Sequence, residues 1–169
     1  MIHQVDIYGK DKVETAIETM QFFEPKDGSG YYLAFSGGKD SVVLKALADM
    51  AGVKYDAHYN VTSVDPPELV RFVKTFPDVQ FEHTYDKDGK PYTMWNLITK
   101  NHFPPSPFAR YCCKYLKESS GEGRITLTGV RWAESTNRKL NQGRVSVYAY
   151  GEEMDETDFF AKTPRGGWC

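Results

Sequence analysis

Apolar runs typical of buried β-strands alternate along this chain with segments whose apolar residues follow helical spacing. The strand-like runs cover residues 31–35, 54–62, 79–84 and 124–130, and the helical patterns cover 10–23, 40–52, 65–76, 93–102 and 108–118. Parallel strands need a crossover between them, and that crossover is usually a helix. The alternation therefore predicts an α/β fold with a mostly parallel central sheet covered by helices on both faces.

Two of the helical segments carry signals for their inward face or their ends. In segment 40–52, Gly52 is the expected stop, and the residues expected to face the core are Val43, Leu44, Leu47 and Met50. In segment 65–76, Asp65 is the expected N-cap and Pro66 the first helical residue.

The composition bounds the class of protein. Of 169 residues, 40% are hydrophobic and 26% are charged, which predicts a globular chain with one domain over residues 1–169. The net charge of −2 excludes a chain-wide basic field for nucleic acid. There is no bilayer-spanning apolar run, and the first residues lack a signal-peptide core. Three cysteines are a poor disulfide framework, which favours a reducing compartment. From these observations together we expect a cytoplasmic protein with no membrane partner.

The end of the chain is the least legible part. It stops at Cys169 without a closing element. The domain is therefore expected to be truncated at its C-terminus, with Cys169 an incidental residue there.

A polar hexapeptide, SGGKDS, joins the first strand-like run to the second helical segment. Parallel sheets bind ligands at the carboxyl ends of their strands, which is where it lies. Glycine lets the backbone approach a ligand, the amides of a helix start attract anions, and lysine adds a positive charge. A capped strand-to-helix turn is the alternative, and it would explain a lone glycine pair. The full hexapeptide favours a phosphate site made of Ser36, Gly37, Gly38, Lys39, Asp40 and Ser41.

SGGKDS resembles the pyrophosphate loop of the PP-loop adenine-nucleotide superfamily. Three further blocks, VTSVDPPELVRFV, FPPSPFARYCCKYLKE and LTGVRWAESTNRK, resemble its phosphoadenosine phosphosulfate (PAPS) reductase-like family, so that the match runs from about Tyr31 to Lys139. The resemblance implies a three-layer sandwich around a mostly parallel five-stranded sheet, the HUP or adenine nucleotide alpha-hydrolase-like fold. It also implies an adenine nucleotide, ATP or PAPS, as the ligand.

Two arginines follow the strand-like run 124–130. Arginine binds phosphate or sulfate through two parallel hydrogen bonds. The resemblance implies that Arg131 and Arg138 meet the phosphate or sulfate end of the nucleotide. The alternative is a solvated helix start with a Glu134–Arg138 pair.

Three polar residues end the second strand-like run. Because an open sheet binds ligands at this edge, Thr62, Ser63 and Asp65 are candidates for contacts with the nucleotide's adenosine. For Asp65 the competing interpretation is the N-cap already described.

Adjacent cysteines, Cys112 and Cys113, lie among basic residues that favour the thiolate form. In relatives that reduce adenosine phosphosulfate, such a pair ligates a [4Fe–4S] cluster together with a second, downstream pair. This chain has only Cys169 besides them, which disfavours a cluster. The alternative is that one of the two is a buried helix residue. Cys169 stands in RGGWC, which does not match the nucleophile motif of those reductases.

Three functions remain open. One is a PAPS reductase-like enzyme that reduces or transfers the sulfonyl group of an adenylyl sulfate, with a thiol reductant protein as partner. The second is an ATP pyrophosphatase that adenylates a nucleic-acid or protein acceptor, with Lys39 stabilising the leaving group and Asp40 helping to place Mg²⁺. The other three blocks favour the first function as a family assignment, whereas Lys39 favours the second, since the family's reductases usually have the loop altered. The third is a non-catalytic nucleotide-binding module of a larger assembly. A homodimer is compatible with each.

Overall fold

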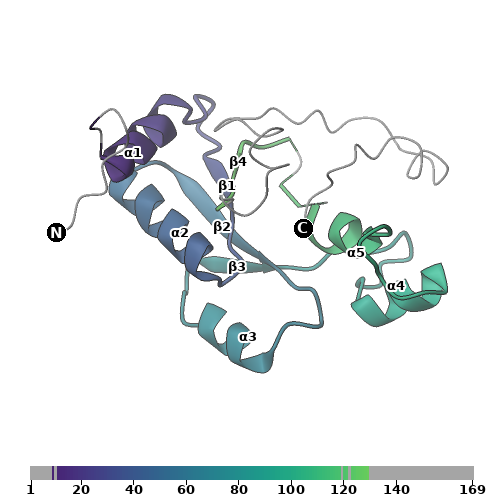
Figure 1. Ribbon diagram of the computed structural model, residues 1–169. Coiled ribbons are helices and arrows are strands. Elements are labelled where there is room, and N and C mark those ends of the chain that lie inside the picture. The colour runs from purple at the N-terminus through teal and green to yellow at the C-terminus, as the bar shows by residue number, and fades with distance from the viewer. Residues whose placement is uncertain (1–8, 10, 119, 122, 130–169) are drawn as a thin grey trace. The chain divides into compact units, whose positions relative to one another are not determined.

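The computed structural model describes residues 9, 11–118, 120, 121 and 123–129. The chain divides into two compact units, Met1–Gly129 and Val130–Cys169, and all described residues belong to the first. Among them no helix is long and apolar enough to cross a membrane. The elements follow in the order α1 (Lys12–Phe22), β1 (Tyr31–Ala34), α2 (Lys39–Ala51), β2 (Tyr55–Asn60), α3 (Pro67–Val73), β3 (Val79–Glu82), α4 (Met94–Asn101), α5 (Tyr111–Cys113), the π-helix η1 (Lys114–Glu118) and β4 (Thr126–Leu127) (Figure 1).

The four described strands form one parallel sheet in the order β3-β2-β1-β4. The predicted α/β class and parallel sheet are thus confirmed. The fourth strand is shorter than the sequence pattern indicates, because only Thr126 and Leu127 pair with β1. The fifth strand and the three-layer HUP arrangement are not among the features that the described residues define, and they stay predictions.

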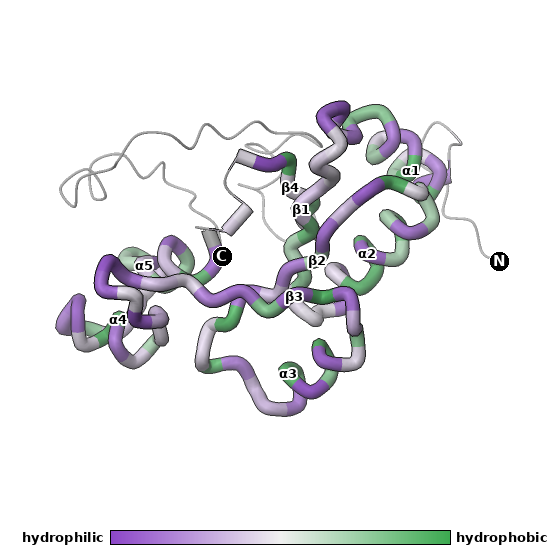
Figure 2. The backbone as a smooth tube through the Cα atoms, turned by 180° about the vertical axis from the view of Figure 1, so that it is seen from behind, coloured by the Kyte–Doolittle hydropathy of each residue, from purple (hydrophilic) through white to green (hydrophobic). Residues whose placement is uncertain are grey.

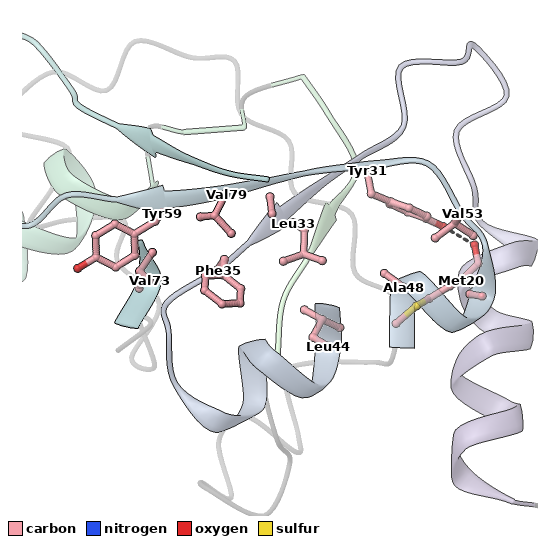
Figure 3. Close-up of a cluster of buried hydrophobic side chains, with 12 residues drawn as sticks. Met20, Tyr31, Leu33, Phe35, Leu44, Ala48, Val53, Tyr59, Val73 and Val79 are labelled. Atoms are coloured by element: carbon pink, nitrogen blue, oxygen red, sulfur yellow. Dashed lines mark hydrogen bonds between the residues drawn. The ribbon is translucent and has the colours of Figure 1, made fainter. Parts of the chain in front are cut away.

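The main hydrophobic core lies between one face of the sheet and helices α1, α2 and α3. Figure 3 shows Leu33 of β1 and Phe35, which follows β1, on the side of the sheet that faces Leu44 and Ala48 of α2. Tyr31 joins this core and donates a hydrogen bond from its hydroxyl to the Met20 carbonyl, at 2.7 Å. Because side chains alternate across a strand, the residues between these face the opposite side of the sheet.

Helix α2 buries a different face from the one predicted. Val43 and Met50 are 57% and 64% exposed, so their assignment to the core was wrong. Three and four residues apart is the spacing of one helix face, and the buried residues Ser41, Leu44, Ala48 and Ala51 follow it. The tube in Figure 2 alternates between hydrophobic and hydrophilic colours along α2, as expected for a helix with one apolar face.

The predicted end of α2 is confirmed, whereas the predicted start of α3 is wrong by one residue. Gly52 ends α2 in the left-handed conformation, with φ 66°, as predicted. Helix α3 begins one residue later than expected, with Pro66 as N-cap and Pro67 as the first helical residue. Asp65 is therefore not the N-cap; its carboxylate bonds to other side chains.

The connection from β3 to β4 carries a second, smaller core. Leu97, Tyr111 and Leu116 pack together there, from α4, α5 and η1, and Figure 1 shows α4 and α5 side by side. The helix predicted over 108–118 exists only from Tyr111, and its second half is wound as a π-helix. Farther along, a β-carbon on Gly121 would stand 2.8 Å from the Tyr32 ring. This connection therefore lies against the sheet face opposite α2.

Candidate functional site

The strand order defines a switch point in the sheet. The chain passes from β1 to β2 on one side and returns much later to place β4 on the other side of β1. In open parallel sheets, ligands bind outside the carboxyl ends of the two strands at such a point. Here those two ends lead into Ser36–Ser41 after β1 and into residues 128 and 129 after β4.

The loop after β1 is held by short local hydrogen bonds. Ser41, buried on α2, donates from Oγ to the Gly38 carbonyl at 2.8 Å. The Ser36 hydroxyl lies 3.3 Å from the Ser41 hydroxyl and 3.4 Å from the Gly38 amide nitrogen. Ser36, Gly38 and Lys39 are exposed. Ser41 thus fixes the loop from inside, and the outer residues remain accessible to a ligand.

Helix α2 starts in a way that suits an anion. Its N-cap is Gly38, which makes no side-chain cap hydrogen bond, and the first amides of any α-helix lack intrahelical acceptors. The helix dipole adds partial positive charge there. Lys39 is the first helical residue and Asp40 the second, so the charged groups of the hexapeptide stand at this helix start.

Gly37 has a packing role that sequence reasoning missed. Its φ is +73°, and a β-carbon there would lie 2.7 Å from Val73 Cγ2 and 2.8 Å from Leu69 Cδ1. Both side chains belong to residues of α3. The glycine therefore lets the loop lie directly against α3, in addition to presenting backbone to a ligand.

The segment that follows β4 contacts the start of α2. A β-carbon on Gly129 would lie 3.1 Å from the carbonyl carbon and oxygen of Asp40. Gly129 belongs to the fourth sequence block, LTGVRWAESTNRK, so the described start of this block lies beside the loop. Arg131 and Arg138 themselves lie outside the described residues.

The residues predicted to contact adenosine are engaged in local bonds. Asp65 accepts hydrogen bonds from the Tyr59 hydroxyl and from Thr62 Oγ1, both at 2.7 Å. Burial raises the pKa of Tyr59, and its bond to the Asp65 carboxylate raises it further. Ser63 adopts φ +65°, and its hydroxyl accepts from the Met94 amide at 2.9 Å. These side chains stabilise the loop after β2 and connect it to α4.

Ser63 and Asp65 also line an open cavity of about 540 Å³ beside α3. Val61 and Phe81 contribute apolar surface, and Arg71 stands on the α3 side. The described residues that line this cavity do not include the hexapeptide. The loop and the cavity are therefore separate features, which meet different faces of α3.

The cysteine block reaches the same edge of the sheet through backbone carbonyls. Thr84 Oγ1 donates to the Tyr115 carbonyl at 2.7 Å, and Asn60 Nδ2 donates to the Lys117 carbonyl at 3.2 Å. Both acceptors belong to η1, and π-helical turns frequently mark functional sites. The blocks SGGKDS, VTSVDPPELVRFV and FPPSPFARYCCKYLKE thus meet at the carboxyl edge of the sheet, and LTGVRWAESTNRK starts there.

The described cysteines do not by themselves form an iron–sulfur site. Cys112 is a free thiol of intermediate exposure, whereas Cys113 is buried. Such a cluster needs four thiolates, and the whole sequence has three cysteines. Within the described part of the chain, no three His, Cys, Asp or Glu side chains gather as a metal site.

A buried histidine within β2 was absent from the sequence prediction. His58 is 7% exposed and lies on the sheet face opposite α2, stacked on Tyr32 with ring centroids 4.2 Å apart. Burial raises the pKa of Tyr32, so its phenol stays protonated. The alternation of Asp56, His58 and Asn60 with apolar residues in β2 was the available signal, since polar residues in a buried strand need partners.

Fold and site together define a parallel α/β protein with a glycine-containing loop at its switch point. Comparisons of the chain with protein-family models, curated proteins and solved structures give no match. The resemblance to the PAPS reductase-like family therefore rests on the four sequence blocks.

Proposed function

We propose that this chain is an adenine-nucleotide-binding domain of the PAPS reductase-like PP-loop family, with Ser36–Ser41 holding the phosphates. The observation that carries the proposal is the position of this loop. It leaves β1 at the switch point of the sheet and runs into an α2 N-terminus capped by glycine. Backbone amides, exposed hydroxyl and lysine side chains, and the helix dipole then act on one anion.

The reaction that this loop supports best is cleavage of ATP between its α and β phosphates. An acceptor oxygen attacks the α phosphorus, the acceptor becomes adenylated, and pyrophosphate leaves. Lys39, at the first position of α2 and exposed, neutralises the charge that develops on the leaving pyrophosphate. Asp40 is the chain's candidate for Mg²⁺ carried by the nucleotide, since Mg²⁺ is commonly held by one or two carboxylates plus phosphates. Arg131 and Arg138 are proposed to assist.

Reduction of an adenylyl sulfate is the second candidate. It is favoured by the hydrogen bond between Asn60 and the Lys117 carbonyl, which ties the cysteine block to the nucleotide edge. A non-catalytic nucleotide-binding module is the third. The three share the binding site and differ in their products.

Calorimetric titration of ATP and of PAPS, each with and without Mg²⁺, tests the binding site. We expect wild type to bind at least one nucleotide and Lys39→Ala to weaken it at least tenfold, because a charge-assisted contact to phosphate is lost. Lys87→Ala, which removes an exposed lysine in the turn after β3, is the matched control and should bind like wild type. Absence of binding by wild type would refute the proposal.

Product analysis then separates the candidates. Pyrophosphate released from ATP selects the pyrophosphatase, and sulfite released from PAPS with a thiol reductant selects the reductase. Nucleotide binding without either product, across candidate protein and nucleic-acid acceptors, selects the module.

A further inference from the structure

The sheet face opposite α2 carries a polar cluster made of Tyr32, His58, Asn60, Glu82 and Ser120, of which Tyr32 and His58 are buried. The rings of Tyr32 and His58 are nearly parallel, at 6°, and stacked. His58 Nδ1 lies 2.8 Å from Glu82 Oε1, and Ser120 Oγ donates to Asn60 Oδ1 at 2.8 Å. The cluster therefore joins three strands to the segment after η1.

Glu82 determines which nitrogen of His58 is left open. A carboxylate only accepts hydrogen bonds, so the Nδ1 that faces it carries the proton. In the neutral imidazole, Nε2 is then an acceptor. This Nε2 is buried and has no hydrogen-bond partner among the described residues.

Tyr32 presents a second open group. Its hydroxyl is also buried and makes no hydrogen bond of standard geometry in the described part of the chain, although weak hydrogen bonding to Ser120 and Asn60 opposes the rise of its pKa. Buried polar atoms in native proteins almost always have a partner, and each orphan is costly. Both atoms belong to the stacked ring pair, and a bound ligand group or water would supply the missing partners.

The position of His58 favours a ligand of the loop. Its carbonyl accepts from the Phe35 amide at 2.8 Å, and Phe35 directly precedes Ser36. The side chains predicted to meet adenosine are used elsewhere: Thr62 and Asp65 bond to each other, and Ser63 bonds to Met94. His58, within β2, and Tyr32, the second residue of β1, hold the open polar atoms on this face of the sheet.

We propose that His58 Nε2 and the Tyr32 hydroxyl bind the nucleoside half of the nucleotide, with Glu82 fixing the histidine tautomer. This inference rests on the proposed function. The group recognised is a hydrogen-bond donor, and an adenosine nucleotide has two sources of one, the ribose hydroxyls and the 6-amino group of adenine. His58 is a specificity residue in this scheme, and it takes no part in the loop's phosphate contacts.

Nitrogen-detected NMR of the histidine rings tests the contact in the unmodified protein. ATP should shift the His58 Nε2 resonance, whereas inorganic tripolyphosphate, which lacks the nucleoside, should leave it in place. The exposed His83, next to Glu82 in the chain, is the internal control. An unchanged His58 resonance in protein saturated with ATP would overturn the inference and assign the open atoms to buried water.

Calorimetry with matched variants gives an independent reading. His58→Phe keeps a ring against Tyr32 and removes Nε2, and Glu82→Gln removes the group that fixes the tautomer. We expect each to weaken ATP binding about tenfold and to leave tripolyphosphate binding within about twofold. Equal weakening of both ligands would indicate a general structural role and contradict the proposal.

Analogues identify the donor group. If the 6-amino group is recognised, purine riboside triphosphate, which lacks it, will bind wild type and His58→Phe equally. If a ribose hydroxyl is recognised, the analogue that lacks that hydroxyl, 2′-deoxyATP or 3′-deoxyATP, will bind the two proteins equally. Failure of the proposed function is distinguishable from failure of the His58 contact alone, because wild type would then bind neither ATP nor tripolyphosphate through Lys39. That result would remove this inference as well.

Discussion

Gly37 and Val73 are in contact at a distance that leaves no room for a side chain at position 37. A β-carbon on Gly37 would stand 2.7 Å from Val73 Cγ2, and Val73 is fully buried. The loop that leaves β1 and the helix that follows β2 are thereby held together through a single glycine.

Replacing Gly37 tests this contact. Gly37→Ala should lower the free energy of unfolding by about 1–3 kcal/mol, because it combines a clash in the core with a positive φ. Gly38→Ala is the matched control, since Gly38 has φ −75° and its β-carbon would meet only Ser36 Oγ, at 3.4 Å. Urea unfolding measures both, and equal effects of the two substitutions would contradict the contact.

Ser63 couples the loop after β2 to α4 through a strained backbone. Ser63→Ala should cost about 0.5–2 kcal/mol, because the Met94 amide loses its acceptor while the left-handed conformation remains. Ser63→Asn should cost less, since asparagine tolerates that conformation and offers a side-chain oxygen. Amide hydrogen exchange over α4 reports the change locally. If α4 in Ser63→Ala exchanges at the wild-type rate, the bond to Met94 contributes nothing.

Arg124 ties three strands together at the opposite edge of the sheet. Its Nη2 lies 2.8 Å from Asp56 Oδ2 on β2 and 3.1 Å from the Tyr31 carbonyl on β1. Arg124→Ala should lower the free energy of unfolding by about 1–3 kcal/mol, since charge-assisted bonds are lost and carbonyls at the edge lose their donor.

The control for this prediction is Arg71→Ala. Arg71 is 77% exposed and lies 3.9 Å from Glu68, so its loss should cost under about 0.5 kcal/mol. Thermal unfolding of the two variants gives the comparison. An Arg124 effect no larger than that of Arg71 would show that the bonds at the edge are dispensable.

Alkaline pH should destabilise the fold through its buried tyrosines. Burial raises the pKa of Tyr59 and of Tyr31 above the ordinary value of 10.0. A raised phenol pKa means that the folded state favours the neutral form, so the stabilisation is complete below about pH 10 and is lost as the pH rises through the folded-state pKa.

Unfolding measured from pH 8 to 11 checks this expectation. The free energy of unfolding of wild type should fall above about pH 10. Tyr59→Phe should be less stable at pH 8, because the bond to Asp65 is lost, and its stability should decline less steeply above pH 10. A wild-type stability that stays constant to pH 11 would be inconsistent with the burial of these phenols.

The parallel sheet and the helix order could be predicted because the periodicity of apolar residues is a local signal. Helix α2 shows the limit of that signal. Val43 and Met50 are apolar, yet the face that packs on β1 is set by Leu44 and Ala48, and apolar content alone does not distinguish one side of a short helix from the other.

The candidate site was predictable only in part. The loop Ser36–Ser41 is contiguous in the chain, so its chemistry could be recognised before its position was known. The pairing of His58 with Glu82 and its stacking on Tyr32 join three strands, and no local pattern specifies which residues of separate strands meet. Asp65 shows the reverse case: its position suggested an N-cap or a ligand contact, and its carboxylate is used by Tyr59 and Thr62.

The placement of β4 beside β1 has a consequence for the order of folding. Arg124, just before β4, bonds to the Gly30 carbonyl 94 residues earlier, whereas β1, β2 and β3 pair with near neighbours along the chain. Closing a long loop costs chain entropy before its contacts are gained, so we expect the three-stranded part to form first and β4 to dock last. During synthesis, Ser36–Ser41 emerges from the ribosome well before Gly129, and the switch point of the sheet is complete only when β4 has paired with β1.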